Sequence, residues 1–277
     1  MKLRILFLTN ARNGAPDEDR LVVEFLSSDF DLKVCHPREC LPYLSTVDGV
    51  IIRNIWPTHE YEGEWEYVKS HLRASGLPVY NPLGFNGDIE GKDYLLALYN
   101  DGYPVIPSID RVENIQELPR SQNYWIKPKK SCDGVGAEKL TLEALIKRNP
   151  HDYVIQPFVE FDYEPSFFFV DNRFHHCVWA RHRLLDDRVA GYSPNSADLK
   201  FAVNFVRWAG LDFGVQRIDA VRLKDGRLLL TEVENLCPYL YLTEVDAATR
   251  MRFLNSLKVS MSKSLSCPIS FGREFAI

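Results

Sequence analysis

The 277-residue chain lacks long apolar runs, an excess of positive charge and any paired cysteine motif. No run approaches the roughly 18–20 apolar residues of a membrane span. The run Ile5 to Leu8 has the length of a strand rather than of a signal peptide. The formal net charge of −5 gives no support to a nucleic-acid or anionic-membrane partner. The six cysteines form no C-x-x-C pair, which argues against zinc and dithiol sites and fits a cytoplasmic protein with reduced thiols.

A dinucleotide fingerprint is also missing, because no G-x-G-x-x-G follows the first apolar run. What the first part of the chain does have is alternating strand and helix patterns. The expected strands are Leu3 to Leu8, Asp31 to Cys35, Gly49 to Arg53 and Leu77 to Tyr80, and the expected helices are Asp17 to Ser28 and Tyr61 to Ser75. This order predicts a small parallel sheet with helices on both faces. Arg53 falls at the carboxyl end of a strand, where such sheets place ligands, and is predicted as a substrate contact.

The second part of the chain mixes hairpins with isolated helices, which predicts an α+β arrangement within an overall α/β protein. The expected strands are Tyr124 to Pro128, Tyr153 to Val159, Ser166 to Val170 and Arg173 to Arg181. The expected helices are Lys92 to Asn100, a short one capped by Thr141, Ser196 to Ala209, and a long one capped by Thr243 and reaching about Ser262. The polar stretch Leu184 to Asn195 is expected to be an irregular loop.

One stretch, Val215 to Pro238, has the pattern of a β-hairpin with Asp225-Gly226 between two apolar-rich runs. A two-residue loop of this kind favours a type I′ turn with positive φ at both positions. With such a loop Lys224 faces Arg227, and the register places Asp219 opposite Glu232.

The same register puts Arg217 opposite Glu234 and sends all four charged side chains to one face. The three carboxylates, Asp219, Glu232 and Glu234, repel one another unless a cation joins them. Oxygen-only ligands suit Mg²⁺, which takes one or two carboxylates and completes its shell with waters and phosphates. A solvated acidic face is the alternative, because the other side of the hairpin is apolar.

A second candidate site begins at Lys127-Pro128 and continues into the glycine-containing loop Ser131 to Gly136. A lysine supplies a point charge, and glycines let backbone N–H groups approach phosphate oxygens. The pattern is not a Walker A loop, because the lysine precedes the glycines. A phosphate clamp and a simple surface turn are both open from these residues alone.

Taken in order, these features are more specific than any one of them. Together with Lys92, Gln156-Pro157-Phe158-Val159 and Glu164-Pro165-Ser166, the chain resembles the ATP-grasp superfamily. Within it, the pattern is most similar to the small D-cycloserine-forming and glutathione-synthetase-like ligases. That likeness covers nearly the whole chain and is carried by Ile51 to Trp56, Tyr80 to Pro82, Gly91 to Ser108 and Glu232 to Leu242.

The resemblance implies a nucleotide site in which two lysines hold the phosphates, the glycine loop closes over them, a hinge strand reads the adenine edge and a glutamate accepts from the ribose. The residues implied to contact ATP are Lys92, Lys127, Ser131, Gly134, Val135, Gly136, Gln156, Pro157, Phe158, Val159 and Glu164.

The resemblance also assigns the charged hairpin. Asp219, Glu232 and Glu234 would bind two Mg²⁺ ions, with Mn²⁺ as an alternative ion. Asn235, one place further on, is the weaker alternative to Glu234. Arg181 and Arg217 would steady the transferring phosphoryl group.

The activity implied is an ADP-forming ligase that joins a small carboxylate substrate to an amine or thiol acceptor through an acylphosphate. An ATP-grasp small-molecule kinase and a nucleotide-binding module without turnover are the alternatives. The implied organisation is a Rossmann-like domain at 1–83 and an ATP-grasp domain at 84–277. The latter would comprise a lid at about 105–160 and a metal-binding part at about 161–277. A homodimer is left open, as are the substrates.

Overall fold

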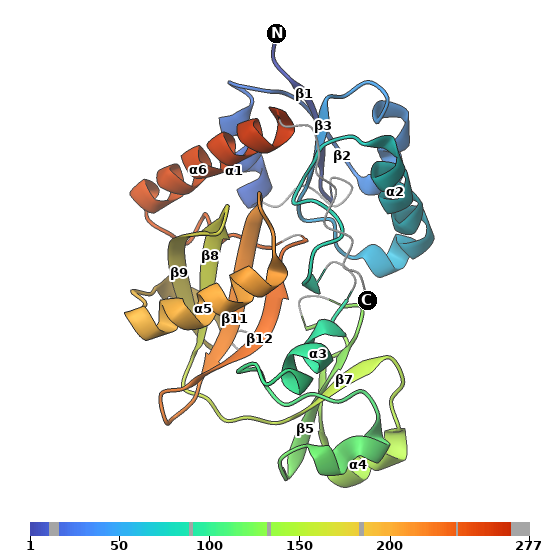
Figure 1. Ribbon diagram of the computed structural model, residues 1–277, viewed down its shortest axis with the longest axis vertical. Helices are drawn as coiled ribbons and strands as arrows, with labels where there is room; N and C mark the ends of the chain where they lie inside the picture. Colours follow the sequence, from blue (N-terminus) through green and yellow to red (C-terminus); the bar gives the residue numbers. More distant parts are fainter. Residues whose placement is uncertain (11–16, 89–90, 132–133, 183–185, 237, 267–277) are drawn as a thin grey trace.

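The computed structural model describes residues 1–10, 17–88, 91–131, 134–182, 186–236 and 238–266. Three sheets organise these residues (Figure 1). Cys132 and Asp133 of the predicted glycine loop and Leu184 and Leu185 of the predicted irregular stretch lie outside the described ranges. Within those ranges, no helix combines the length and the apolar character needed to cross a membrane.

The first sheet is parallel, as predicted, with strand order β2-β1-β3-β4. Its strands are β1 (Arg4–Leu8), β2 (Asp31–Cys35), β3 (Gly49–Ile52) and β4 (Val79–Tyr80). Side chains alternate across β1, so Ile5 and Phe7 join one apolar core and Leu6 and Leu8 another. Helices α1 (Asp17–Leu26) and α6 (Ala247–Ser266) cover the first face, and α2 (Glu62–Ser75) covers the second (Figure 1). The predicted helices on both faces are therefore present.

Helix α6 returns from the end of the chain to this first sheet, which the sequence did not indicate. It also begins later than predicted. Thr243 does not cap it, because the Thr243 hydroxyl donates to Glu244. The capping side chain is Asp246, whose carboxylate accepts from the Thr249 backbone N–H at 2.9 Å, and the helix starts at Ala247.

The second sheet is antiparallel with order β6-β5-β7 and stands at the far end of the molecule from the first (Figure 1). Its strands are β5 (Asn123–Pro128), β6 (Glu138–Thr141) and β7 (Tyr153–Pro157). Helix α4 (Leu142–Arg148) begins where predicted, because the Thr141 hydroxyl accepts from the Ala144 N–H at 3.2 Å. Strand β6 was not predicted. Helix α3 (Tyr94–Asn100) precedes this sheet, and 3-10 turns lie at Pro37–Glu39, Leu41–Tyr43, Thr58–Tyr61 and Val112–Glu117.

The third sheet is antiparallel and has five strands in the order β10-β9-β8-β11-β12. They are β8 (Glu164–Val170), β9 (Arg173–His182), β10 (Asp186–Gly191), β11 (Val215–Arg222) and β12 (Leu228–Glu234), with helix α5 (Ser196–Ala209) on one face (Figure 1). The prediction of an irregular loop at Leu184 to Asn195 is wrong in part, because β10 pairs with β9 along the sheet edge. The predicted hairpin at Asp171-Asn172 is confirmed, and both residues have positive φ.

The β11–β12 hairpin reaches its predicted pairing by an unpredicted route. Leu223 donates to the Arg227 carbonyl at 2.9 Å, so residues 224–226 form a three-residue loop and Lys224 does not face Arg227. Gly226 takes a φ of 86° while Asp225 keeps a negative φ, so the predicted type I′ turn is wrong.

This longer loop shifts every pair near it by one place. Ala220 therefore faces Leu230, and an unbroken ladder would set Asp219 opposite Thr231. A bulge between Asp219 and Ala220 leaves Thr231 as the extra residue and restores the pairing of Asp219 with Glu232. The register that the sequence predicted at the open end of the hairpin is confirmed.

Candidate functional site

A cavity of about 370 Å³ lies between the second and third sheets. Strands β5 and β7 supply one wall, and β8, β9, β11 and β12 supply the other. The cavity is lined by Lys92, Ile106, Trp125, Lys127, Ser131, Gly134, Ala137, Gln156, Pro157, Phe158, Val159, Phe161, Glu164, His182, Arg217, Asp219, Val221, Thr231, Glu232, Glu234 and Tyr241. Most of the residues that the sequence singled out are therefore brought to one place.

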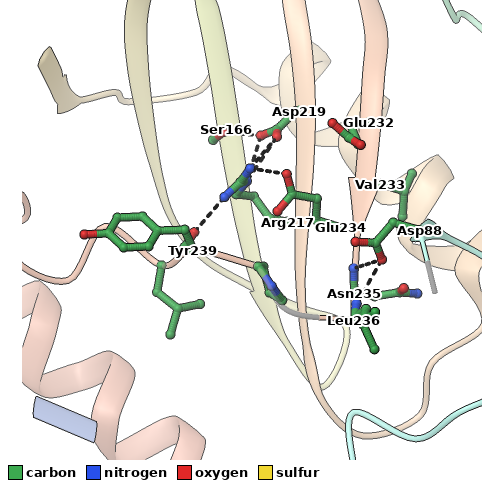
Figure 2. Close-up of polar contacts among 12 residues, drawn as sticks. Asp88, Ser166, Arg217, Asp219, Glu232, Val233, Glu234, Asn235, Leu236 and Tyr239 are labelled. Carbon is green, nitrogen blue, oxygen red and sulfur yellow. Dashed lines mark hydrogen bonds and ion pairs between the residues drawn. The ribbon is translucent and has the colours of Figure 1, made fainter. Parts of the chain in front are cut away.

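The charged side chains of the hairpin share the cavity face because strand residues alternate. Arg217 pairs with Glu234 and Asp219 with Glu232, while the intervening pair Ile218 and Val233 is buried in the core beneath. Figure 2 shows Asp219 and Glu234 beside the Arg217 guanidinium, with Glu232 further along β12.

Arg217 is the centre of this cluster. Its Nε donates to the Asp219 oxygens at 3.1 and 3.0 Å, its Nη2 donates to both Asp219 and Glu234, and its Nη1 donates to the Tyr239 carbonyl at 2.9 Å. Burial alone would lower the pKa of Arg217, but Asp219 and Glu234 outweigh it and hold that pKa well above its usual range. The Ser166 hydroxyl donates to Asp219 from the neighbouring strand. Two of the three carboxylates are thus held by one fixed cation.

Glu232, the third carboxylate, pairs with a different cation. The Lys92 Nζ lies 2.7 Å from Glu232 Oε1 and also donates to the Ser131 carbonyl. Burial opposes ionisation of Glu232, yet Lys92 and Lys127 overcome it and lower its pKa. Burial lowers the pKa of Lys127, and Glu232 offsets only part of that effect. A buried lysine with little local compensation suits a site that receives an anion.

The donor set fits Mg²⁺ only together with further ligands. Among the described residues, no three acidic, histidine or cysteine side chains converge closely enough to hold a metal ion by themselves. Burial raises the pKa of Glu234, and Asp219 and Glu232 raise it further while Arg217 lowers it. The three carboxylates therefore repel one another, and a further cation would reduce that repulsion. Because all the donors are oxygens, the cluster fits Mg²⁺ that arrives with phosphate oxygens in its shell.

The other end of the cavity is apolar and contains the predicted hinge. Gln156, Pro157, Phe158 and Val159 follow one another along this wall, beside Trp125, which pairs with Gln156, and Ile106 also lines the cavity. The Gln156 amide donates to the Ser108 hydroxyl at 2.9 Å, so its side chain is turned into the protein. Glu164 lines the same cavity, and the His182 Nδ1 lies 4.0 Å from its carboxylate.

Several predicted residues lie elsewhere. Arg181 is exposed and does not line the cavity. Glu164 pairs with Ala180, so alternation brings His182 rather than Arg181 to the cavity face. Val135 is 59% exposed, and neither it nor Gly136 lines the cavity.

Asn235 also points away from the cavity, because it follows Glu234 in the strand (Figure 2). Its amide donates to the Asn86 carbonyl at 2.6 Å. Glu234 thus lines the cavity and Asn235 does not, while the choice between them as a metal ligand stays a prediction.

Arg53 is buried away from this cavity in an ion-pair network of its own. Its guanidinium lies 2.7 Å from Glu18 and 3.3 Å from Asp19, and it donates to the Pro238 carbonyl at 2.9 Å. Its predicted contact with a substrate stays a prediction.

Sequence reasoning missed two kinds of neighbour. Apolar residues such as Trp125 and Tyr241 line the cavity but carry no pattern that separates them from core residues. Asp88 was missed because its loop shows no periodicity. Its carboxylate accepts from the backbone N–H groups of Asn235 and Leu236 at 3.0 and 2.9 Å and so ties down the end of β12 (Figure 2). Burial raises the pKa of Asp88 to about 6.

No protein-family model and no curated protein sequence matches this chain. Its three-dimensional structure has the ATP-grasp fold, with the parallel sheet at the amino-terminal end followed by the two antiparallel sheets.

The solved structures that it resembles include one synthetase and two ligases. D-cycloserine synthetase DcsG gives a TM-score of 0.73 at 20% identity over 92% of this chain and 99% of that chain. D-alanine–D-alanine ligase from Bacillus anthracis complexed with ATP gives 0.59 at 17% identity over 95% and 99%. The ATP-grasp ligase PsnB complexed with a phosphomimetic variant of its minimal precursor, Mg and ADP gives 0.63 at 13% over 93% and 98%. At these identities the likeness establishes the fold and not the activity.

Proposed function

We propose that this protein is an ATP-dependent carboxylate–amine (or thiol) ligase that works through an acylphosphate and releases ADP and phosphate. The observation that carries the proposal is the single cavity in which two lysines, a hinge segment and an acidic hairpin meet. Solved structures of the same fold are described as ligases, and one of them holds Mg and ADP. The substrate class that we propose is a small amino-acid-like carboxylate.

The cavity has an apolar part for a base and a positively charged part for phosphates, as a bound nucleotide requires. Ile106, Trp125 and Phe158 make an apolar end that suits the adenine ring. Lys92 and Lys127 lie towards the other end, where they would hold phosphate oxygens as point charges. Glu164 lines the facing wall, at the start of β8, and would accept from the ribose hydroxyls. ATP would then lie with its γ-phosphate over the ends of β11 and β12.

The acidic hairpin would hold magnesium. Asp219, Glu232 and Glu234 are the ligands that we propose, with phosphate oxygens and water completing the shell. When bound, Mg²⁺ would neutralise the charge on the β- and γ-phosphates. Arg217, fixed by Asp219 and Glu234, presents a cation that cannot lose its proton beside the transferring group.

The proposed reaction requires the substrates to be positioned, and it requires no nucleophilic side chain. A substrate carboxylate oxygen attacks the γ-phosphorus, the bond to ADP breaks, and an acylphosphate forms. The acceptor nitrogen or sulfur then attacks the acyl carbon, phosphate leaves, and the acceptor proton passes to solvent. Phosphoryl transfer of this kind is accelerated mainly by alignment and by cancelling charge. Lys92, Lys127 and Arg217 supply that charge.

Trapping the acylphosphate tests the proposal directly. The purified protein is incubated with ATP, Mg²⁺, a panel of amino acids and hydroxylamine, and both ADP and hydroxamate are measured. A ligase yields hydroxamate in step with ADP. A stable phosphorylated product without hydroxamate would establish a kinase instead, and ATP binding with no ADP release across the panel would establish a binding module.

Glu232→Gln is the decisive variant, because it keeps the shape of the side chain and removes the proposed metal ligand. We expect ADP formation to disappear while the near-ultraviolet circular dichroism spectrum stays native, although the melting temperature falls because Lys92 loses its partner. Glu24→Gln, an exposed position on α1, is the matched control and should retain full turnover. Undiminished turnover in Glu232→Gln would exclude this residue as a metal ligand.

A further inference from the structure

Two buried side chains from the amino-terminal part of the chain, Arg53 after β3 and Glu18 in α1, hydrogen-bond to the loop that follows β12. Arg53, at the end of β3, donates to the Pro238 carbonyl at 2.9 Å. Glu18, at the start of α1, accepts from the Leu240 N–H with both oxygens, at 3.0 and 2.8 Å. Arg53 and Glu18 also bind each other at 2.7 Å. The pair therefore forms hydrogen bonds to the backbone on both sides of Tyr239.

Tyr239 is the residue whose backbone meets the candidate site. Its carbonyl accepts from Arg217 Nη1 at 2.9 Å (Figure 2). That bond fixes the one Arg217 nitrogen that does not already bind Asp219 or Glu234. A displacement of the Tyr239 carbonyl would rotate the guanidinium and with it both carboxylates.

The backbone of this loop is held in a conformation that it would not adopt freely. Tyr241 has a φ of 54°, a left-handed value that is uncommon for a residue other than glycine. Its ring nevertheless lines the cavity and stands 5.8 Å from the Arg217 guanidinium. Such conformations persist where the surroundings over-determine them. Arg53 and Glu18 supply part of those surroundings through Pro238 and Leu240.

Stability does not explain a buried pair of this kind. Glu18, Asp19 and Arg53 are at most 4% exposed, and desolvating such charges costs about as much as their attraction returns. The attested use of such pairs is to select one geometry. Here the geometry selected is that of the segment between Pro238 and Leu240.

We propose that Arg53 and Glu18 are positioning residues for Arg217. They act through the backbone of Tyr239 and set the orientation of the Arg217, Asp219 and Glu234 cluster from the first sheet. Arg53 then serves the site without touching substrate. This inference rests on the proposed function only for its consequence, which is Mg²⁺-dependent binding of ATP.

The test compares two buried ion pairs of the same molecule. The positioning pair is removed as the double variant Glu18→Gln/Arg53→Met. Asp19 then loses Arg53 but keeps its hydrogen bonds from Thr9 and Asn54. The matched control is Asp198→Asn/Arg222→Met. In this control pair Asp198 is buried and Arg222, a residue of β11, is partly buried; in the described part of the chain neither side chain hydrogen-bonds to residues 238–242. Arg53→Lys, which keeps the charge but cannot span Glu18 and Pro238 together, is the milder companion should the double variant fail to fold.

Two readouts separate positioning from simple destabilisation. The first is the dissociation constant of ATP with EDTA and with excess Mg²⁺, since the ratio reports the carboxylate cluster. The second is the ¹⁵N signal of the Arg217 Nε–H group, assigned by its absence in Arg217→Lys. This readout needs no ligand.

In the positioning variants we expect the gain in ATP affinity caused by Mg²⁺ to fall by about 10- to 100-fold, as for other outer partners of metal ligands. Affinity in EDTA should be unchanged, and the Arg217 signal should shift and exchange faster with water. The control should keep both the Mg²⁺ gain and the signal, although it melts earlier.

Retention of the Arg217 signal and of the Mg²⁺ gain in a folded positioning variant would overturn the inference, as would equal losses in the control. If the wild-type protein shows no Mg²⁺ gain at all, the metal assignment of the proposed function fails. The Arg217 signal then still decides whether Arg53 and Glu18 position that side chain.

Discussion

Replacing Arg217 by methionine tests how far the acidic hairpin depends on its internal cation. The side chain is 7% exposed and binds Asp219, Glu234 and the Tyr239 carbonyl. Methionine keeps much of the apolar length and removes the charge. Removing one partner of a buried ion pair costs about 3–5 kcal/mol, because the other charge is left uncompensated. In this cluster, two carboxylates lose their cation at once.

For a protein of this size, about 1 kcal/mol corresponds to a change in melting temperature of roughly 2–4 °C. We therefore expect Arg217→Met to melt about 6–12 °C below the wild type, taking about 3 kcal/mol as the lower end of the range. The assay is thermal unfolding followed by near-ultraviolet circular dichroism in metal-free buffer. Urea midpoints provide a second measure of the same loss.

The control is Arg227→Met, which removes an exposed pair with Asp225. Those side chains are 70% and 51% exposed, so their pairing is worth about 0–1 kcal/mol. A melting temperature for Arg217→Met within about 2 °C of the wild type would refute the reasoning. It would mean that the carboxylates do not rely on Arg217 for their compensation.

The remaining predictions concern one binding residue and one buried histidine. Lys127→Ala should weaken ATP binding by about 1.5–3 kcal/mol, or roughly 10- to 100-fold in Kd by calorimetry, because a charged contact to phosphate is lost; an unaltered Kd would remove Lys127 from the site. Burial, with a smaller effect of His175, lowers the pKa of His176 from 6.5 to about 3. The unfolded chain then binds the extra proton between those values, so stability falls as pH falls below 6.5. Between about pH 7.5 and about pH 5, the free energy of unfolding measured with urea should fall by about 2 kcal/mol less in His176→Gln than in the wild type. The control His71→Gln, at an exposed position, should behave like the wild type. Parallel pH curves for His176→Gln and the wild type would contradict the assignment.

The sequence predicted the buried strands better than the exposed ones. The strands β1 and β3 are nearly continuous apolar runs because both faces of a parallel sheet are covered. The two strands that the sequence did not reveal, β6 and β10, are edge strands of their sheets. In β6, most side chains are exposed, so no apolar alternation marks it. An edge strand pairs on one side only, and the local sequence does not reveal which strand it pairs with.

The candidate site was predictable where one local hairpin carried the whole signal. Asp219, Glu232 and Glu234 could be placed on one face from alternation within a single hairpin. The choice between Arg181 and His182 could not be made in the same way. It depends on which residue of β8 faces Ala180, a pairing that the strand's own sequence leaves open. Arg53 was out of reach for a similar reason, since its Pro238 partner is 185 residues away.

The hairpin itself shows where packing constrains the register of this sheet. Its turn has one residue more than a two-residue loop, and one extra residue at Thr231 cancels that shift before the charged pairs begin. The bulge also leaves Thr231 and Glu232 both lining the cavity, where strict alternation would send one of them into the core. We therefore expect variation at the turn to be tolerated, because none of the residues 224–226 lines the cavity. The pairing of Asp219 with Glu232 is not free to vary, since a slip of one residue would bury a carboxylate against Ile218 and expose the core beneath it.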